Sequence, residues 1–118
     1  MKNINQSLLF LDDSVHRQQE FSREYPNATI VSTAIEAISM LRSRSFSVVY
    51  LDHDLSGEIY VSSERQDTGM EVVRWIVENQ PVIDKIVVHT MNEVAGPIMV
   101  NTLQQAGYKA KWLPFGFS

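Results

Sequence analysis

The sequence contains no cysteine and no long hydrophobic run. Without cysteine, disulfides, thiolate nucleophiles and cysteine-ligated zinc sites are all excluded. The same absence fits a reducing compartment, and we therefore expect a cytoplasmic protein. No apolar run approaches the roughly 20 residues that a membrane span requires, so we expect no membrane segment. Residues 1–6 also lack the apolar core and the small-residue cleavage site of a signal peptide.

Basic residues are outnumbered by acidic ones, with 10 Lys and Arg against 14 Asp and Glu and a formal net charge of −4. Proteins that bind duplex DNA through its phosphates usually carry a basic surplus, so we do not expect duplex binding. The charge is compatible with a small anionic substrate held by a metal ion and a few local cations. The 118 residues contain no repeat, linker or low-complexity segment, which predicts one domain spanning residues 1–118.

Short apolar runs alternate with amphipathic segments along the chain. The runs predict strands at residues 7–11, 28–32, 47–51, 84–88 and 109–113. The segments between them predict helices at residues 14–25, 33–44, 69–79 and 93–106. Strict alternation is typical of an α/β fold in three layers, with helices on both faces of a doubly wound, parallel five-stranded sheet. No helix is predicted after the fifth strand, so one flank of the sheet would be thinly covered, and a homodimer would cover it.

Capping residues mark the expected ends of the helices. Asp13 or Ser14 can accept hydrogen bonds from the free N–H groups at the start of the first helix. Thr33 and Glu36 have the spacing of a capping box before the second helix. Gly107 suits the C-terminus of the fourth helix, where a left-handed residue is common.

Three of the apolar runs end in polar residues. These ends are Asp12-Asp13, Asp52-His53-Asp54 and His89-Thr90-Met91-Asn92. In an open parallel sheet, functional groups lie just beyond the carboxyl ends of the strands. We therefore expect four carboxylates, two imidazoles, a hydroxyl and an amide at one edge of the sheet. So much charge in one place needs a cation or a substrate to balance it.

A polar segment at residues 55–68 interrupts the alternation of strands and helices. It is longer than the few residues that usually connect a strand to a helix. Loops of this length beside a site often act as lids or binding loops. Tyr60 is the aromatic residue in this segment that we consider for stacking on a nucleic-acid base.

Several of these polar residues also have purely structural interpretations. In the structural interpretation, Asp13 and Thr68 are simply helix caps with no further role. Asn92 can cap the fourth helix or bind a substrate. Arg17 can pair with a nearby carboxylate. Asp52 is harder to explain structurally, because polar groups at the end of a buried strand need partners.

Residues that follow four of the strands form a recognisable pattern. They are the pair Asp12-Asp13 after the first, Asp52 after the third, Thr90 or His89 after the fourth, and Leu113-Pro114 after the fifth. This pattern resembles a response-regulator receiver domain over nearly the whole chain, and it implies the flavodoxin-like strand order 2-1-3-4-5. Receivers have a lysine where this chain has Leu113, so the cation that senses an acyl phosphate is absent.

Four short motifs occur in a fixed order along the chain. They are Leu11-Asp12-Asp13 followed by Arg17, Leu51-Asp52-His53-Asp54-Leu55, Thr68-Gly69, and His89 followed by Asn92. Their joint occurrence resembles the cyclic-phosphate-processing receiver domain, an offshoot of the receiver superfamily. The resemblance implies metal-assisted processing of a cyclic phosphate, carried by an RNA end or a cyclic nucleotide.

The acidic residues suit a hard divalent cation. Mg²⁺ prefers carboxylate oxygens, and if an imidazole nitrogen also coordinates, Mn²⁺ or Zn²⁺ becomes an alternative. We predict a Mg²⁺ or Mn²⁺ site formed by the carboxylates of Asp12, Asp13, Asp52 and Asp54. A metal there would neutralise the carboxylates and bind a phosphate oxygen.

Two histidines suit the proton transfers that open a cyclic phosphate. Neighbouring strands lie about 4.8 Å apart, so His53 and His89 would flank one phosphorus if their strands are neighbours, as they are in receivers. Histidine titrates near neutral pH, so one ring can act as base and the other as acid. Asp52 would orient one ring or hold the metal. The predicted substrate-binding residues are Arg17, Thr68, Thr90 and Asn92.

Two alternative functions belong to other classes. A stand-alone receiver would accept a phosphoryl group on Asp52 and relay the signal by a conformational change. A degenerate receiver would bind another protein without any chemistry. Leu113 in place of lysine disfavours the first alternative, and the presence of all the acids and both histidines disfavours the second.

Overall fold

The structure is a computed structural model that describes residues 7–55 and 68–114. The strands are β1 (Leu8–Leu11), β2 (Thr29–Val31), β3 (Val48–Leu51), β4 (Lys85–Val88) and β5 (Ala110–Trp112). The helices are α1 (Val15–Glu24), α2 (Ala34–Ser43), α3 (Gly69–Asn79) and α4 (Ala95–Gln105). Every predicted strand and helix is present. The largest difference is at α4, which begins at Ala95 rather than at residue 93.

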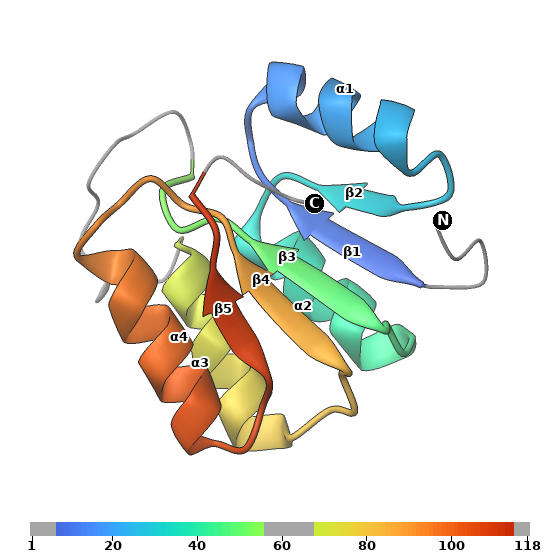
Figure 1. Cartoon of the computed structure of the whole chain (residues 1–118). Helices are drawn as coiled ribbons and strands as arrows, with labels where there is room; N and C mark the ends of the chain where they lie inside the picture. The colour runs from blue at the N-terminus through green and yellow to red at the C-terminus, as the bar shows by residue number, and fades with distance from the viewer. Residues whose placement is uncertain (1–6, 56–67, 115–118) are drawn as a thin grey trace.

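The strands form one parallel sheet in the order β2-β1-β3-β4-β5 (Figure 1). This confirms the flavodoxin-like order that the resemblance to receivers implied. In register, Leu11 of β1 pairs with Leu51 of β3, and Leu51 pairs with Val88 of β4. These three strands therefore end at the same level, and the residues that follow them emerge side by side.

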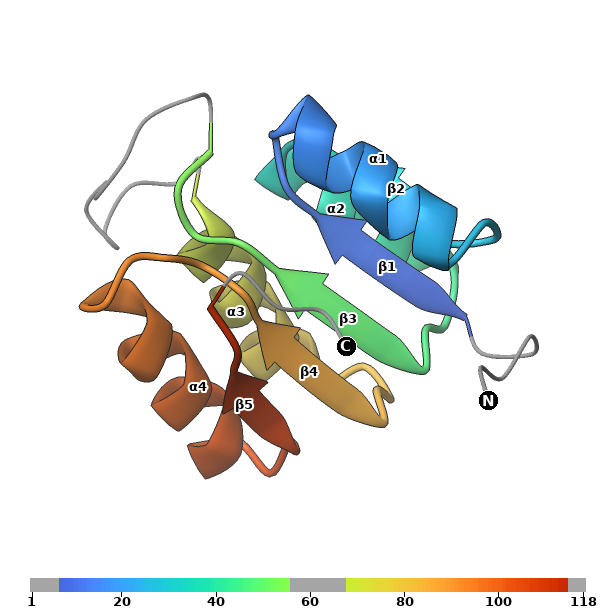
Figure 2. The same ribbon diagram turned by 45° about the horizontal axis from the view of Figure 1, so that its top comes forward.

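Helices cover both faces of the sheet, which gives three layers. Figure 2 shows α1 on one face, over β1 and β2, with α2, α3 and α4 on the other. Alternate strand residues enter the two cores. The core under α2, α3 and α4 includes Leu9, Leu11, Val49, Leu51, Ile86 and Val88. The core under α1 includes Leu8, Phe10, Phe21, Val48, Tyr50 and Val87. Burial on both faces explains why the strands read as continuous apolar runs.

The face that carries α1 has no second helix in the part of the chain that the structure describes. The expectation that no helix follows the fifth strand concerns a segment of which residues 115–118 lie outside the described residues. The homodimer that would cover the rest of this face stays a prediction. No helix among residues 7–55 and 68–114 is long and apolar enough to cross a bilayer. Tyr60 and most of the predicted lid, residues 56–67, lie outside the described residues.

Local capping fixes the ends of the helices. Ser14, rather than Asp13, is the N-cap of α1, and its hydroxyl accepts from the N–H of Arg17 at 3.3 Å. The expected capping box of Thr33 and Glu36 is present at α2. Gly107 follows α4 with a φ of 99°, which a residue with a side chain rarely adopts.

Gly69 begins α3 at the point where this helix meets the end of β3. Its N–H donates to the carbonyl oxygen of His53 at 3.0 Å. A Cβ atom at Gly69 would lie 1.7 Å from the backbone oxygen of Asp52 and 2.8 Å from its carbonyl carbon. Backbone atoms cannot swing away as a flexible side chain can, so only glycine allows this close approach.

We expect the substitution Gly69→Ala to destabilise the protein by about 3 kcal/mol, because the new methyl group overlaps the backbone of Asp52. In an open helical position the same change stabilises a protein by roughly 0.5–1 kcal/mol. Urea unfolding followed by circular dichroism measures the difference. Glu78→Ala, at an exposed position of α3, is the control and should change stability by less than about 0.5 kcal/mol. A Gly69→Ala variant as stable as this control would contradict the contact.

Candidate active site

The register of the sheet brings Asp12, Asp52 and His89 together. Each of them directly follows a strand residue that is paired in register with its neighbours. Their backbone continues the ladder, since the N–H of Asp52 donates to Leu11 and the N–H of His89 donates to Leu51. One ligand atom from each of the three side chains lies within 4.8 Å of the others, and all three residues are buried.

The carboxylate of Asp12 is at the centre of this group. Its Oδ1 accepts from the N–H of Ser14 at 2.8 Å and from Nη2 of Arg17 at 3.1 Å. Its Oδ2 lies 2.6 Å from Nε of Arg17 and 2.9 Å from Nε2 of His89. Burial raises the pKa of Asp12, but hydrogen bonds from His89 and Arg17 outweigh this effect and hold the pKa below its ordinary value. Asp12 is therefore ionised at neutral pH.

Arg17 supplies the positive charge of the site from the first turns of α1. Its guanidinium binds Asp12 through two nitrogens and lies 3.6 Å from Oδ2 of Asp52. The hydrogen bonds to Asp12 raise the pKa of Arg17 above its ordinary value. The side chain remains 31% exposed, whereas that of Asp12 is fully buried. Of the two side chains that donate to Asp12, Arg17 is therefore the exposed one, because His89 is buried.

The negative charge of Asp52 is compensated by fewer hydrogen bonds than that of Asp12. Its Oδ1 accepts from the N–H of His53 at 2.8 Å. Burial raises the pKa of Asp52 to about 6, and the negative charge of Asp12 acts in the same direction. The nearby His89 and Arg17 lower it only in part. This carboxylate is therefore the group in the site that would gain most from an additional cation.

The imidazole of His89 is held by an aromatic ring and a carboxylate. Its ring stacks on Phe10, with 4.8 Å between the ring centroids and 9° between the planes. Because Asp12 is ionised and can only accept, Nε2 of His89 carries the proton of this hydrogen bond. The other nitrogen, Nδ1, is buried and has no hydrogen-bond partner among the described residues. In the neutral ring, Nδ1 is a free proton acceptor.

His53 forms a second pair of the same kind with a different carboxylate. Its Nδ1 lies 2.8 Å from Oδ1 of Asp54, and Nδ2 of Asn92 donates to the same oxygen at 3.3 Å. The ring is fully buried, and Nε2 has no hydrogen-bond partner within residues 7–55 and 68–114. His53 and His89 thus lie at the ends of neighbouring strands, as predicted, but each ring is held by its own aspartate.

The other predicted site residues have defined positions. The backbone N–H of Asn92 donates to Oγ1 of the buried Thr90 at 3.1 Å. Oδ1 of Asn92 accepts from the N–H groups of Val94 and Ala95, so this side chain caps the start of α4 and also binds Asp54. Thr68 is buried and is the N-cap residue of α3, although its side chain makes no capping hydrogen bond.

The predicted metal ligands do not all meet. Among the described residues, the group of acids and histidines that close around one point consists of Asp12, Asp52 and His89. Asp13 is half-buried beside this group but is not part of it. Asp54 binds His53 instead. The donor set at the end of the sheet is therefore two carboxylates and one imidazole, rather than four carboxylates.

The end of β5 brings no cation to the site. Leu113 stands where receivers have lysine, and its N–H donates to the carbonyl oxygen of Val88 at 2.8 Å. Its side chain packs against the core under α1. Within the described residues, the guanidinium that contacts the carboxylates comes from the opposite side of the group, from α1.

Three supporting residues were not predicted. Phe10 reads in the sequence as an ordinary core residue, and nothing in its pattern signals the stacking on His89. Gln18 donates to the backbone oxygen of Asp12 at 2.6 Å and to Ser32 at 2.8 Å, which holds the turn between β1 and α1. The indole of Trp112 donates to the backbone oxygen of Thr90 at 2.8 Å. Apart from the bond between Gln18 and Asp12, these contacts join residues at least 14 positions apart, so local patterns cannot reveal them.

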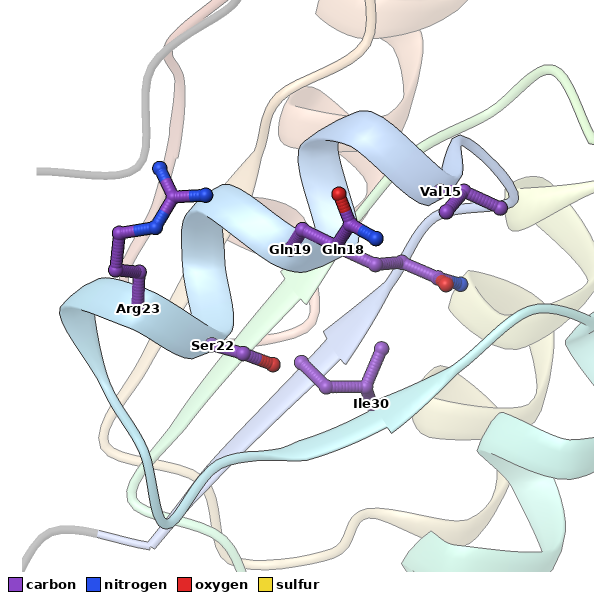
Figure 3. A pocket seen from close by; sticks show the side chains of 6 residues that line it. All are labelled: Val15, Gln18, Gln19, Ser22, Arg23 and Ile30. Carbon is purple, nitrogen blue, oxygen red and sulfur yellow. The ribbon is translucent and has the colours of Figure 1, made fainter.

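A hollow between α1 and β2 (Figure 3) adjoins the turn after β1, because Gln18 lines it and also binds the backbone of Asp12. It is lined by Val15, Gln18, Gln19, Ser22, Arg23 and Ile30. Its lining contains no carboxylate and no imidazole, so it offers no acid–base pair. We therefore locate the chemistry at the carboxyl ends of β1, β3 and β4.

Solved structures with the same fold include response regulators. TrrA from Thermotoga maritima, in complex with Mg²⁺-BeF, has a TM-score of 0.70 at 16% identity, covering 96% of this chain and 89% of that one. A CheY-like receiver domain from Methanospirillum hungatei has a TM-score of 0.69 at 17% identity, covering 96% and 83%. A Burkholderia pseudomallei regulator with a phosphorylated aspartic acid and calcium has a TM-score of 0.69 at 16% identity, covering 97% and 62%. At these identities the likeness shows the fold alone.

The sequence also matches a family model. No curated protein matches the sequence of this chain. The model for the cyclic-phosphate processing receiver domain matches residues 7–105, a range that includes all the acids and histidines of the site. Because this match covers most of the chain, the protein belongs to the cyclic-phosphate processing receiver domain family.

Proposed function

We propose that this protein is a metal-dependent phosphodiesterase that opens a cyclic phosphate on an RNA end or a cyclic nucleotide. The observation that carries the proposal is the presence of two aspartate–histidine pairs at the ends of neighbouring strands. In both pairs one ring nitrogen binds a carboxylate, and the other is buried without a partner among the described residues. Two oriented imidazoles with free nitrogens are what an acid–base reaction requires.

The reaction breaks one phosphorus–oxygen bond of the ring. A water oxygen attacks phosphorus while one imidazole takes a proton from this water, and the other imidazole protonates the leaving oxygen. In the proposal, His89 and His53 perform these two transfers in opposite protonation states. Asp12 and Asp54 fix which nitrogen of each ring is free, because an ionised carboxylate accepts only from a protonated nitrogen. The product is a phosphate ester with one ring bond fewer.

A divalent metal fits beside these pairs. Asp12 and Asp52 present buried carboxylate oxygens at one point, and a hard cation such as Mg²⁺ or Mn²⁺ prefers such ligands. The raised pKa of Asp52 shows that its negative charge is under-compensated, and a bound cation would relieve this. When bound, the metal would neutralise the carboxylates and withdraw charge from a phosphate oxygen. We assign Asp54 to orienting His53 instead of binding the metal.

The substrate phosphate would be bound by groups around the strand ends. The guanidinium of Arg17 is the partly exposed cation of the site, and guanidinium groups bind phosphate oxygens through two hydrogen bonds. In the proposal, phosphate oxygens also accept from the hydroxyl groups of Thr68, the N-cap residue of α3, and Thr90, two residues after the end of β4. The amide of Asn92 positions the Asp54–His53 pair through one N–H, and in the proposal its second N–H donates to a phosphate oxygen.

We expect His89→Ala and His53→Ala each to lower turnover by about 10²-fold or more, because each removes one proton transfer. Turnover would be measured on nucleoside 2′,3′-cyclic phosphates, on RNA ending in one, and on cyclic mono- and dinucleotides. Each assay would be run with Mg²⁺, with Mn²⁺ and with EDTA. Wild-type activity is expected only with metal.

His16 provides the matched control for this pair. It lies on α1 with its side chain 80% exposed and pairs with Glu20. His16→Ala should therefore retain wild-type turnover. Full activity of His89→Ala would contradict the role of that residue in the mechanism. Full activity in EDTA would contradict the requirement for a metal ion. No turnover on any member of the panel would reject the phosphodiesterase.

The receiver-like alternative is favoured by one observation, the position of Asp52 directly after β3. A receiver accepts a phosphoryl group on this aspartate and uses the lysine that this chain replaces with Leu113. We expect incubation of the wild-type protein with acetyl phosphate and Mg²⁺ to add no phosphate mass. Intact-protein mass spectrometry measures this, and stoichiometric addition that Asp52→Asn abolishes would support the receiver function instead.

The raised pKa of Asp52 predicts how stability depends on pH without metal. The pKa is about 6 in the folded state and about 3.9 in an unfolded chain. Between these values the folded state binds the proton more tightly, so ionisation increasingly destabilises it as pH rises, and the penalty is complete above pH 6. We expect Asp52→Asn to match the wild type near pH 4 and to be more stable by about 3 kcal/mol at pH 7.

Urea unfolding in EDTA across this pH range measures the difference between the two proteins. The exposed Asp84 provides the control, and Asp84→Asn should show a difference from wild type that does not vary with pH. A constant difference for Asp52→Asn would contradict the raised pKa.

A further inference from the structure

The four acceptor positions of the Asp12 carboxylate are all filled by protein donors. Oδ1 accepts from Ser14 and Arg17, and Oδ2 accepts from Arg17 and His89. A carboxylate offers about four lone-pair directions. A metal ion can therefore bind Asp12 only if one of these donors leaves.

The three donors differ in how firmly they are held. The N–H of Ser14 belongs to the backbone at the N-cap of α1. The ring of His89 is fully buried between the strands and Phe10. Arg17 alone combines a long flexible side chain with 31% exposure. Arg17 is the donor that can move into solvent without disturbing the backbone or the stacked rings.

Electrostatic repulsion by a bound metal ion would also favour the departure of Arg17. Arg17 lies within 3.6 Å of Asp52 as well as 2.6 Å from Asp12, so it occupies the position between the two carboxylates where a metal ion would bind. A divalent ion in that position repels the guanidinium. Once displaced, the guanidinium has lost its carboxylate partner, and a phosphate is the group that suits its two parallel donors.

We propose that Arg17 is an exchangeable internal cation, which leaves Asp12 when a divalent metal binds and then binds the phosphate oxyanion. This extends the proposed function, from which it takes Asp12 and Asp52 as metal ligands and phosphate as the group bound. The exchange couples the two ligands, because the metal frees the residue that the phosphate needs. By thermodynamic linkage, phosphate must then raise the affinity for the metal by the same factor.

The exchange also explains how the buried charge of Asp12 can be compensated both without and with a metal ion. In the resting state Arg17 compensates the buried charge of Asp12, which would otherwise be costly. With metal bound, the same compensation comes from the ion. The order of events is then metal first and phosphate second, and phosphate alone competes poorly with Asp12 for the guanidinium.

The test is direct Mn²⁺ binding to the full chain, measured by the electron paramagnetic resonance signal of free Mn²⁺, with and without inorganic phosphate. We expect phosphate to raise the Mn²⁺ affinity of the wild type by about tenfold. Arg17→Met, which keeps the apolar stem but removes the competing charge, should bind Mn²⁺ about tenfold more tightly without phosphate. It should also lose most of the phosphate effect.

Two further variants separate this exchange from general effects of charge and folding. Arg17→Lys keeps the charge but cannot form the two-nitrogen contact, so its Mn²⁺ affinity should fall between those of wild type and Arg17→Met. Arg23→Met removes an exposed charge on the same helix, away from Asp12, and should behave as wild type. Thermal unfolding of each variant in EDTA shows whether it folds, and Arg17→Lys carries the test if Arg17→Met does not.

Equal Mn²⁺ affinities in wild type, Arg17→Lys and Arg17→Met would overturn the exchange, as would weaker binding after loss of Arg17. A wild-type affinity that phosphate leaves unchanged would also overturn it. These outcomes do not depend on turnover. A protein that exchanges Arg17 but hydrolyses no cyclic phosphate would contradict the proposed function only, whereas an active enzyme with equal affinities would contradict the exchange only.

Discussion

The buried carboxylate of Asp12 is the constraint around which the site is arranged. Its position follows from the sheet, because β1 lies between β2 and β3 and ends in register with β3. An ionised group at that depth must be fully satisfied by hydrogen bonds, or the fold would lose several kcal/mol. The donors come from the N-cap of α1, the first turn of that helix and the end of β4. Satisfying one charge therefore fixes the orientation of α1 and of His89 at once.

At the same edge of the sheet, burial outweighs hydrogen bonding for Asp52, the reverse of the situation at Asp12. It accepts one backbone hydrogen bond and lies at a longer distance from Arg17, so its pKa is raised to about 6 while that of Asp12 is lowered. Two neighbouring carboxylates with pKa values shifted in opposite directions are typical of functional sites. A structural role would be served equally well by a neutral side chain at Asp52. The stability that this ionisation costs is consistent with a position kept for binding or chemistry.

The sequence was sufficient to predict which residues reach the sheet edge, but not how they pair there. Apolar runs that end in acid or histidine place Asp12, Asp52 and His89 correctly, since the ends of buried strands are visible in the pattern. The strand order came from the resemblance to receivers, because single-sequence patterns carry no information about which strands are neighbours. Asp54 was predicted as a metal ligand. In the structure its carboxylate is hydrogen-bonded to His53, a pairing that the sequence pattern does not indicate.

The remaining unpredicted features depend on contacts distant in sequence. Phe10 supports His89 across 79 positions of the chain, and Trp112 supports Thr90 across 22. Gly69 was predicted as the start of α3. However, the need for glycine arises from the backbone of Asp52, which only the folded structure brings close. Local sequence identifies candidates of the right chemistry, whereas partners, protonation and close approach are properties of the assembled sheet.

The position of the positive charge separates this site from the receivers that it resembles. Receivers take their cation from a lysine after the fifth strand, and here Leu113 occupies that position and packs into the core under α1. The cation comes instead from Arg17 on α1, which binds Asp12 through two nitrogens and also lies 3.6 Å from Oδ2 of Asp52. Arg17 thus reaches the carboxylates from a helix over β1 and β2 rather than from the fifth strand (Figure 2). In the exchange proposed above, it moves between a carboxylate and an incoming phosphate, which suits a site that binds and releases a substrate better than one that stores a signal.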